Sequence, residues 1–144
     1  MGKVSIVYWS GTGNTEAMAA AMAEGAKDAG AEVELLTVDK AEAAAISEAK
    51  AFALGCPAMG AEVLEEGEME PFMAELDSQI AGKTIALFGS YGWGGGEWMR
   101  DWESRVVSDG AAVLSGEGII ADNAPDDDVL AECRAAGAKL AALV

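Results

Sequence analysis

The stretch "SGTGNT" (residues 10–15) follows the apolar run "VSIVYW" (4–9) and leads into an alanine-rich segment with helical periodicity. This order predicts a strand, a glycine loop and a helix, an arrangement that can hold a phosphate at a helix amino terminus. The loop contains no lysine or arginine. Backbone N–H groups and hydroxyls would therefore have to satisfy the phosphate by themselves. The alternative is a serine–threonine turn that only caps the helix.

The same loop excludes two other phosphate-binding motifs. Glu16 stands where the dinucleotide fingerprint GxGxxG requires a glycine. A Walker loop would need Gly-Lys-Ser or Gly-Lys-Thr at its end, and this loop contains neither. Hydrolysis of a nucleoside triphosphate is therefore not expected.

Apolar and helical segments alternate along the whole chain. The expected strands span residues 3–9, 31–38, 50–56, 83–90 and 111–121, and the expected helices span 15–29, 40–49, 66–80, 97–109 and a closing segment after Pro125. This alternation predicts an α/β fold, a doubly wound, five-stranded parallel sheet with helices on both faces. Such folds bind ligands beyond the carboxyl ends of their strands, so the loops 10–15, 57–63 and 91–97 should form one site.

The loop after the third expected strand, "GCPAMGAEVLEE" (55–66), combines three unusual features. Met59 places a soft apolar side chain in a polar turn, where it could cover a flat ligand. Gly60 leaves the backbone free to change the orientation of a peptide, and Glu62 could accept a hydrogen bond from a ring N–H. The alternative is an acidic loop with one isolated methionine.

The loop after the fourth expected strand, "GSYGWGGGEW" (89–98), places Trp93 among glycines. An aromatic side chain in such a segment is available to stack on a ligand. Trp98 and Trp102 differ, because their i, i+4 spacing in the following helix indicates packing in the core. Together, the three loops predict a pocket for a phosphorylated planar heterocycle.

The composition narrows the possible functions. The chain of 144 residues has a net charge of −16, which argues against nucleic acid and anionic membrane surfaces as partners. It contains no histidine, the commonest general base and metal ligand, and we expect no metal site. Cys56 and Cys133 are expected to be reduced, buried thiols. No apolar run approaches the length of a bilayer span, which favours a soluble cytoplasmic protein.

Three segments together resemble the flavodoxins, specifically the short-chain clostridial type: "IVYWSGTGNTEAMA" (6–19), "GCPAMG" (55–60) with "EVLEE" (62–66), and "ALFGSYGWGGGEWM" (86–99). The resemblance covers essentially the whole chain. It implies one flavodoxin-like, FMN-binding domain over residues 1–144, with the strand order 2-1-3-4-5. The chain departs from the family pattern at Ala61, where an acidic residue or a serine is usual, and at Pro57, where a serine can stand. Both changes bear on the energetics of this turn and hence on redox tuning.

The resemblance also implies a non-covalent FMN and a set of cofactor-binding residues from all three loops: Ser10, Gly11, Thr12, Gly13, Asn14, Thr15, Ala58, Met59, Gly60, Glu62, Ser90, Tyr91, Gly92, Trp93 and Gly94. Residues 10–15 would bind the phosphate, with Ser90 nearby. Met59 would cover the inner face of the flavin and Trp93 the outer face. Glu62 would accept a hydrogen bond from the ring N3–H.

The function implied by the resemblance is that of a low-potential one-electron carrier, not an enzyme. It would serve redox partner proteins in place of a ferredoxin, cycling between oxidised flavin, neutral semiquinone and anionic hydroquinone. An acidic face would dock the partners, and the protein would act as a monomer. The alternative is a small FMN-dependent quinone or nitro-compound reductase that turns over with a nicotinamide. A phosphoryl-accepting receiver is set aside, because it needs acidic residues where "SGTGNT" and "CPAMG" stand.

Overall fold

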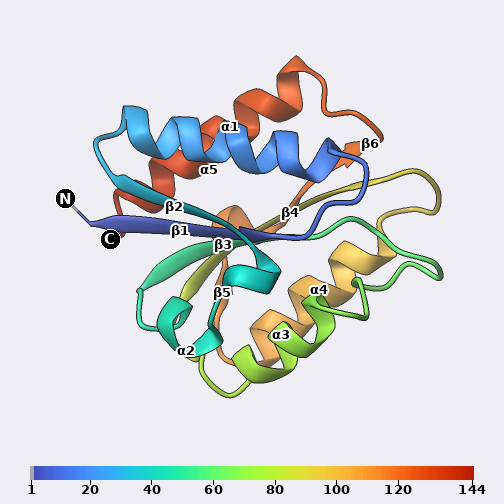
Figure 1. Ribbon diagram of the computed structural model, residues 1–144, viewed down its shortest axis with the longest axis horizontal. Helices are drawn as coiled ribbons and strands as arrows, with labels where there is room; N and C mark the ends of the chain where they lie inside the picture. The colour runs from blue at the N-terminus through green and yellow to red at the C-terminus, as the bar shows by residue number, and fades with distance from the viewer. Residues whose placement is uncertain (1) are drawn as a thin grey trace.

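The computed structural model describes residues 2–144, in which six β-strands alternate with five α-helices (Figure 1). The elements are β1 Lys3–Tyr8, α1 Asn14–Asp28, β2 Glu32–Thr37, α2 Ala43–Ile46, β3 Ala51–Gly55, α3 Met69–Leu76, β4 Thr84–Tyr91, α4 Glu97–Ser108, β5 Ala112–Val113, β6 Ile119–Asp122 and α5 Asp127–Ala141. Two short 3-10 helices, η1 Val38–Lys40 and η2 Leu114–Gly116, follow β2 and β5.

The strands form one parallel sheet in the order β2-β1-β3-β4-β5, so the predicted fold class and strand order are confirmed. Helices α1 and α5 cover one face of the sheet, and α2, α3 and α4 lie on the other (Figure 1). Two apolar cores result, one on each face. All five residues of β3 are buried, because a central parallel strand has both faces covered, which is why its sequence is a continuous apolar run.

The last strand differs from the prediction of one continuous strand over 111–121. Two separate strands pair with β4 instead: β5 along Thr84 and Ile85, and β6 along Phe88–Tyr91. Between them, Ser115 and Gly116 adopt φ angles of 62° and 87°. An extended strand cannot contain this left-handed backbone, so the chain leaves the sheet and rejoins it. The apolar periodicity of the sequence does not reveal such a break in a strand.

Two helices are shorter than predicted. The segment expected as a helix over 40–49 contains only α2, and the segment expected over 66–80 contains only α3. The start of α3 is set by Glu65, whose carboxylate accepts hydrogen bonds from the N–H groups of Gly67 (2.7 Å), Glu68 (2.7 Å) and Met69 (3.0 Å). Burial alone would raise the pKa of the Glu65 carboxyl, but these three donors hold it below its ordinary value.

Both cysteines are free and buried, as the sequence predicts. Burial raises the pKa of Cys56 and of Cys133 to about 12, so both remain neutral thiols at physiological pH. The prediction that Trp98 and Trp102 pack in the core is also confirmed, since each side chain is 1% exposed.

Helices α1 and α5 touch backbone to backbone through two glycines. A Cβ added at Gly25 would overlap the carbonyl of Arg134, and one added at Gly137 would overlap the carbonyl of Met22 and crowd the N–H of Ala26. The two helices are therefore closer than side chains would allow. Both glycines stand inside helices, where glycine is otherwise unfavourable.

Arg105 of α4 ties α3 to α4 on the opposite face. Its guanidinium donates to the carboxylates of Asp77 (Nε to Oδ1, 3.0 Å) and Glu70 (Nη1 to Oε1, 2.8 Å). Asp109, at the carboxyl end of α4, has a buried Oδ2 with no hydrogen-bond partner among residues 2–144. Burial, followed by the neighbouring Asp77 carboxylate, raises the pKa of Asp109 to about 6.

This arrangement predicts that stability depends on the protonation of Asp109. The folded protein binds this proton more tightly than the unfolded chain, so the Asp109 contribution to the free energy of unfolding falls as the pH rises from 3.8 to about 6. Asp109→Asn cannot ionise. It should be more stable than the unmodified protein at pH 7, by about 1 kcal/mol after solvent screening, and equally stable near pH 4. Urea unfolding at both pH values measures the difference, and an equal gain at pH 4 would contradict this explanation.

Candidate cofactor-binding site

The loop between β1 and α1 presents N–H groups that have no acceptor. Ser10 Oγ accepts hydrogen bonds from the N–H groups of Gly13 (3.2 Å) and Glu16 (3.3 Å), so this serine does cap the loop, as the alternative interpretation expected. Among residues 2–144, however, the N–H groups of Asn14 and Thr15 have no acceptor. Free N–H groups at the positive end of a helix are ordinary donors to a bound phosphate.

Thr15 joins this loop to the end of β4. Its Oγ1 lies 3.3 Å from the backbone nitrogen of Ser90 and 3.3 Å from Ser90 Oγ, and both residues are buried. The Thr15 hydroxyl therefore connects the start of α1 to the end of β4 beneath the surface. Of the pair, only Ser90 lines the cleft described below.

The loop after β3 forms a tight turn. Met59 and Val63 exchange two backbone hydrogen bonds (2.9 and 3.0 Å), which close the turn at its base. Gly60 and Glu62 within it have φ angles of 46° and 57°. Nothing lies within 4 Å of the position of a Cβ at Gly60, while the carbonyl oxygen of Gly60 accepts a hydrogen bond from the next loop.

The loop after β4 places Trp93 at the surface, where its side chain is 55% exposed. The indole Nε1 donates to the carbonyl oxygen of Gly60 (3.2 Å), which ties this loop to the turn after β3. Tyr91 lies deeper, its ring centroid 5.6 Å from that of Trp98. Trp98 is fixed in turn by a buried hydrogen bond from Nε1 to the Cys56 carbonyl (2.9 Å).

These loops enclose a cleft of about 240 Å³ beyond the carboxyl ends of the strands. The residues predicted for the site that line it are Gly11, Thr12, Asn14, Ala58, Met59, Ser90, Tyr91, Gly92 and Trp93. The other predicted residues belong to the same loops but do not line the cleft: Ser10, Gly13, Thr15, Gly60, Glu62 and Gly94. Residues from three separate parts of the sequence are thus brought to one edge of the sheet.

The cleft also contains lining residues that the site prediction did not include: Trp9, Pro57 and Asn123. Asn123 follows β6 with a left-handed φ of 61°, and its N–H donates to the carbonyl of Tyr91 (2.7 Å). Its position could have been found from the topology alone. The carboxyl end of the last strand lies at the same edge as those of β1, β3 and β4.

The Glu62 carboxylate is engaged in hydrogen bonds within the protein. Its Oε1 accepts hydrogen bonds from the N–H groups of Gly96 (3.2 Å) and Glu97 (3.0 Å), at the amino terminus of α4. The carboxylate therefore bridges the turn after β3 and the helix after β4. Its second oxygen, Oε2, has no hydrogen-bond donor among residues 2–144.

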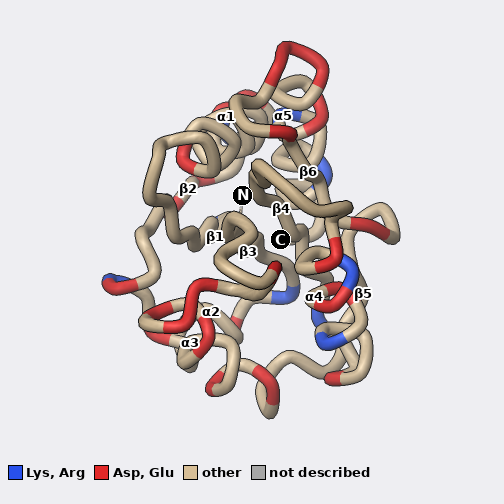
Figure 2. The backbone as a smooth tube through the Cα atoms, turned by 90° about the vertical axis from the view of Figure 1, so that its right-hand side faces the viewer, with Lys and Arg blue, Asp and Glu red and all other residues tan. Residues whose placement is uncertain are grey.

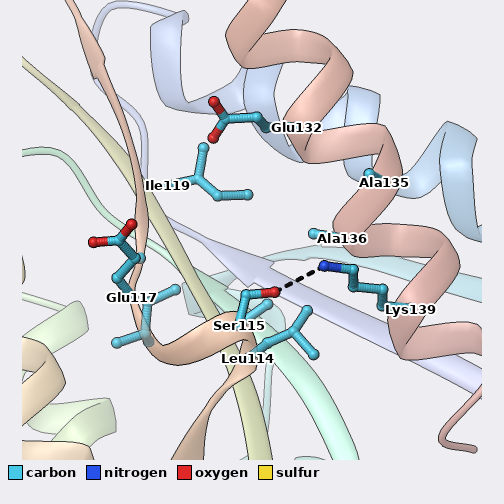
Figure 3. A pocket seen from close by; sticks show the side chains of 11 residues that line it. Leu114, Ser115, Glu117, Ile119, Glu132, Ala135, Ala136 and Lys139 are labelled. Carbon is cyan, nitrogen blue, oxygen red and sulfur yellow. Dashed lines mark hydrogen bonds between the residues drawn. The ribbon is translucent and has the colours of Figure 1, made fainter.

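A second hollow of about 240 Å³ lies elsewhere, between the β5–β6 connection and α5 (Figure 3). Its floor is apolar, and at its rim Lys139 Nζ donates to Ser115 Oγ (3.0 Å), while Glu117 and Glu132 stand nearby. It contains none of the residues from the three loops and lacks an aromatic wall. We therefore place the cofactor site in the cleft at the carboxyl edge.

Figure 2 faces that edge and shows acidic positions on all sides of it, with basic positions fewer and several of them near α4. Among the residues that the structure describes, no lysine or arginine lines the cleft. Within residues 2–144, no helix has the length and apolar character needed to cross a bilayer. The same residues contain no cluster of three or more acidic, histidine or cysteine side chains that could hold a metal ion.

The fold and the cleft define a small doubly wound α/β protein that binds a phosphorylated planar cofactor. Residues 6–137 match the model of the flavodoxin family. The chain is 48% identical over 124 residues to the flavodoxin of Clostridium beijerinckii, covering 86% of this chain and 89% of that protein. It is 47% identical over 135 residues to the flavodoxin of Megasphaera elsdenii, covering 92% and 98%. The chain belongs to the flavodoxin family, and its length fits the short-chain type.

A solved structure supports the same assignment. The solution structure of two-electron reduced Megasphaera elsdenii flavodoxin matches with a TM-score of 0.86 and 45% identity, over 94% of this chain and 98% of that one. FMN is the cofactor of the family, as the sequence predicts. The cleft fits this group, because it combines free N–H groups at the start of α1 with walls that contain Met59 and Trp93.

Proposed function

We propose that the chain acts as a single FMN-binding domain and as a one-electron carrier of low potential. The observation that carries this proposal is a cleft whose donors at the α1 terminus suit a phosphate and whose outer wall is the half-exposed Trp93. A flavin ring held there would keep one edge near the surface, where a partner protein can reach it. The alternative reductase would need room for a substrate as well as a nicotinamide.

Bound FMN would supply the redox chemistry, passing between oxidised, neutral semiquinone and anionic hydroquinone forms. The residues of the chain would determine how easily each form is reached. The carbonyl oxygen of Gly60 would be the acceptor for a ring N–H, and it would have to exchange its hydrogen bond from Trp93 Nε1 for that contact. Met59 and Trp93 would exclude water from the two ring faces.

The absence of cations from the cleft gives the phosphate loop a role in setting the potential. The phosphate charge would be held by N–H groups and hydroxyls, and no side chain of the cleft would neutralise it. A second negative charge on the reduced ring is then disfavoured by repulsion. This makes the fully reduced protein a strong one-electron reductant.

Identification of the cofactor and anaerobic photoreduction of the purified protein test the proposal together. Acid should release one FMN per chain, and the absorption spectrum should pass through the long-wavelength band of a neutral flavin radical. A protein that carries FAD, or one that bleaches in a single two-electron step with no radical, would overturn the proposal.

The alternative reductase is tested by direct turnover with NADH and NADPH. We expect negligible oxidation of either nucleotide by the protein alone, and rapid turnover once a flavodoxin reductase is added. Efficient direct oxidation, coupled to a quinone or a nitro compound, would favour the reductase instead.

Partner docking would use the acidic surface around the cleft. We propose that redox partner proteins present a basic face, so that electron-transfer rates fall as salt screens the attraction. The same acidity disfavours nucleic acid and anionic membrane surfaces. A cytoplasmic location and a monomeric state complete the proposal.

The acidic surface should also influence the lower of the two potentials. Glu62, Glu65, Glu66, Glu97 and Asp101 belong to the loops and helices around the cleft, but Glu65 also caps α3 and cannot be changed without affecting the fold. The exposed Glu66 is the better test. Glu66→Gln should raise the semiquinone–hydroquinone potential by roughly 20 mV, the value for one charge about 10 Å away in water.

Potentiometric titration measures this shift. The oxidised–semiquinone couple should move much less, because the radical is neutral. Glu32→Gln serves as the control, since Glu32 begins β2 at the opposite edge of the sheet and carries the same charge. Equal shifts in both couples, or an equal shift in the control, would contradict the electrostatic explanation.

A further inference from the structure

We propose that Glu62 is a positioning residue that sets the distance between the two loops enclosing the cleft, by capping α4. This inference rests on the proposed function of the cleft. It goes beyond the ring contact implied by the resemblance, because it assigns the Glu62 carboxylate a role within the protein itself.

The first observation is the set of contacts that Glu62 makes across the two loops. Its Oε1 accepts from two successive N–H groups of α4, Gly96 at 3.2 Å and Glu97 at 3.0 Å. Both are at the amino terminus of a helix, where N–H groups lack partners within the helix and a carboxylate is favoured. Among residues 2–144, no side chain of the helix itself replaces this cap.

The second observation concerns Gly94. A Cβ at this position would overlap the carboxylate of Glu62. The loop after β4 is therefore shaped around the carboxylate, which occupies space that any other residue at position 94 would take. The Glu62 carboxylate and the backbone at Gly94 are therefore packed against each other between the two loops.

The third observation is the backbone of Glu62, which has a left-handed φ of 57°. Residues other than glycine, asparagine and aspartate rarely adopt this conformation. The turn is closed at its base by the hydrogen bonds between Met59 and Val63, so its shape is fixed. The backbone at Glu62 is therefore held in a conformation that glycine would adopt more easily.

These contacts link Met59 to Trp93. Met59 begins the turn that carries Glu62, and Trp93 precedes the start of α4 by four residues. The hydrogen bond from Trp93 Nε1 to the Gly60 carbonyl is a second tie between the same loops. The slot for a planar ring is thus held at one width from inside the protein, and Glu62 Oε2 remains available to a ligand.

Amide hydrogen exchange, measured by NMR on the full chain with and without FMN, tests the proposal. In Glu62→Ala, the amides of Gly96 and Glu97 should exchange at least about tenfold faster in both states, because their charged acceptor is gone. The amide of Val129, which donates to Asp126 (2.9 Å) in the separate cap of α5, should not change. The affinities for FMN and for riboflavin should fall by the same factor, roughly tenfold, because the slot and not the phosphate loop is affected.

Two further variants separate the effect of the Glu62 carboxylate from the effects of the strained backbone and of the net charge. Glu62→Gly relieves the strained φ and should still show the fast exchange. Glu97→Gln removes one charge beside the same helix terminus while keeping Glu62, and it should exchange like the unmodified protein. Unchanged exchange at Gly96 and Glu97 in Glu62→Ala, or normal exchange in Glu62→Gly, would overturn the proposal. Amide exchange measured without flavin does not depend on the redox role. A failure of the proposed function would therefore leave this test of Glu62 unaffected.

Discussion

Replacing Gly137 with alanine is expected to lower the free energy of unfolding by about 3 kcal/mol, although alanine is the better helix former. The added Cβ would overlap the Met22 carbonyl and crowd the N–H of Ala26, both backbone groups of α1. Neither group can turn aside as a side chain can, so α1 and α5 must separate. Separation would open the core on that face of the sheet, including the contacts of the fully buried Met22 and Leu140.

Urea unfolding at pH 7 measures this effect. Gly116→Ala is a suitable control, because it adds the same methyl group where nothing lies within 4 Å. Its φ of 87° makes alanine unfavourable there by about 1 kcal/mol, and no packing cost adds to this. A stabilised Gly137→Ala would mean that helix propensity outweighs the contact and that α1 and α5 do not pack as closely as described.

Riboflavin, which lacks the phosphate, is expected to bind at least about 100-fold more weakly than FMN. The N–H groups of Asn14 and Thr15 have no acceptor among residues 2–144, and each hydrogen bond to a charged group contributes roughly 1.5–3 kcal/mol. The positive end of α1 adds to this attraction. Comparable affinities for the two flavins would place the phosphate outside this loop.

Variants of Thr12 test the hydroxyl contribution within the same loop. Thr12 is exposed and lines the cleft, so its side chain can be changed without disturbing the core. Thr12→Ala should weaken FMN binding about tenfold and leave riboflavin binding unchanged, while Thr12→Ser, which keeps the hydroxyl, should behave like the unmodified protein. Fluorescence titration of the flavin-free protein gives all the affinities. Thr15 is less suitable, because its hydroxyl supports Ser90 in the interior.

The sequence was sufficient for the fold class and for the assembly of the three loops around one cleft. Alternating apolar and helical segments require a parallel sheet, and a parallel sheet brings the carboxyl ends of its strands to one edge. For this reason three loops that are distant in sequence could be assigned to one cleft, with Thr12, Met59 and Trp93 among its lining residues. The buried tryptophans of α4 followed from helical spacing alone.

The tertiary structure decided what depends on contacts between distant segments. Periodicity averages over several residues, so it could not detect the left-handed backbone at Ser115 that divides the last strand. Helix propensity predicts that Gly137 destabilises α5. In the structure, Gly137 allows close contact with α1, a helix more than a hundred residues earlier in the chain. The sequence predicted a ligand contact for Glu62. In the structure, its carboxylate also accepts hydrogen bonds from N–H groups 34 and 35 residues further along the chain. Local sequence patterns predict whether a segment forms a helix or a strand. Which backbone groups contact one another is determined only when the chain packs.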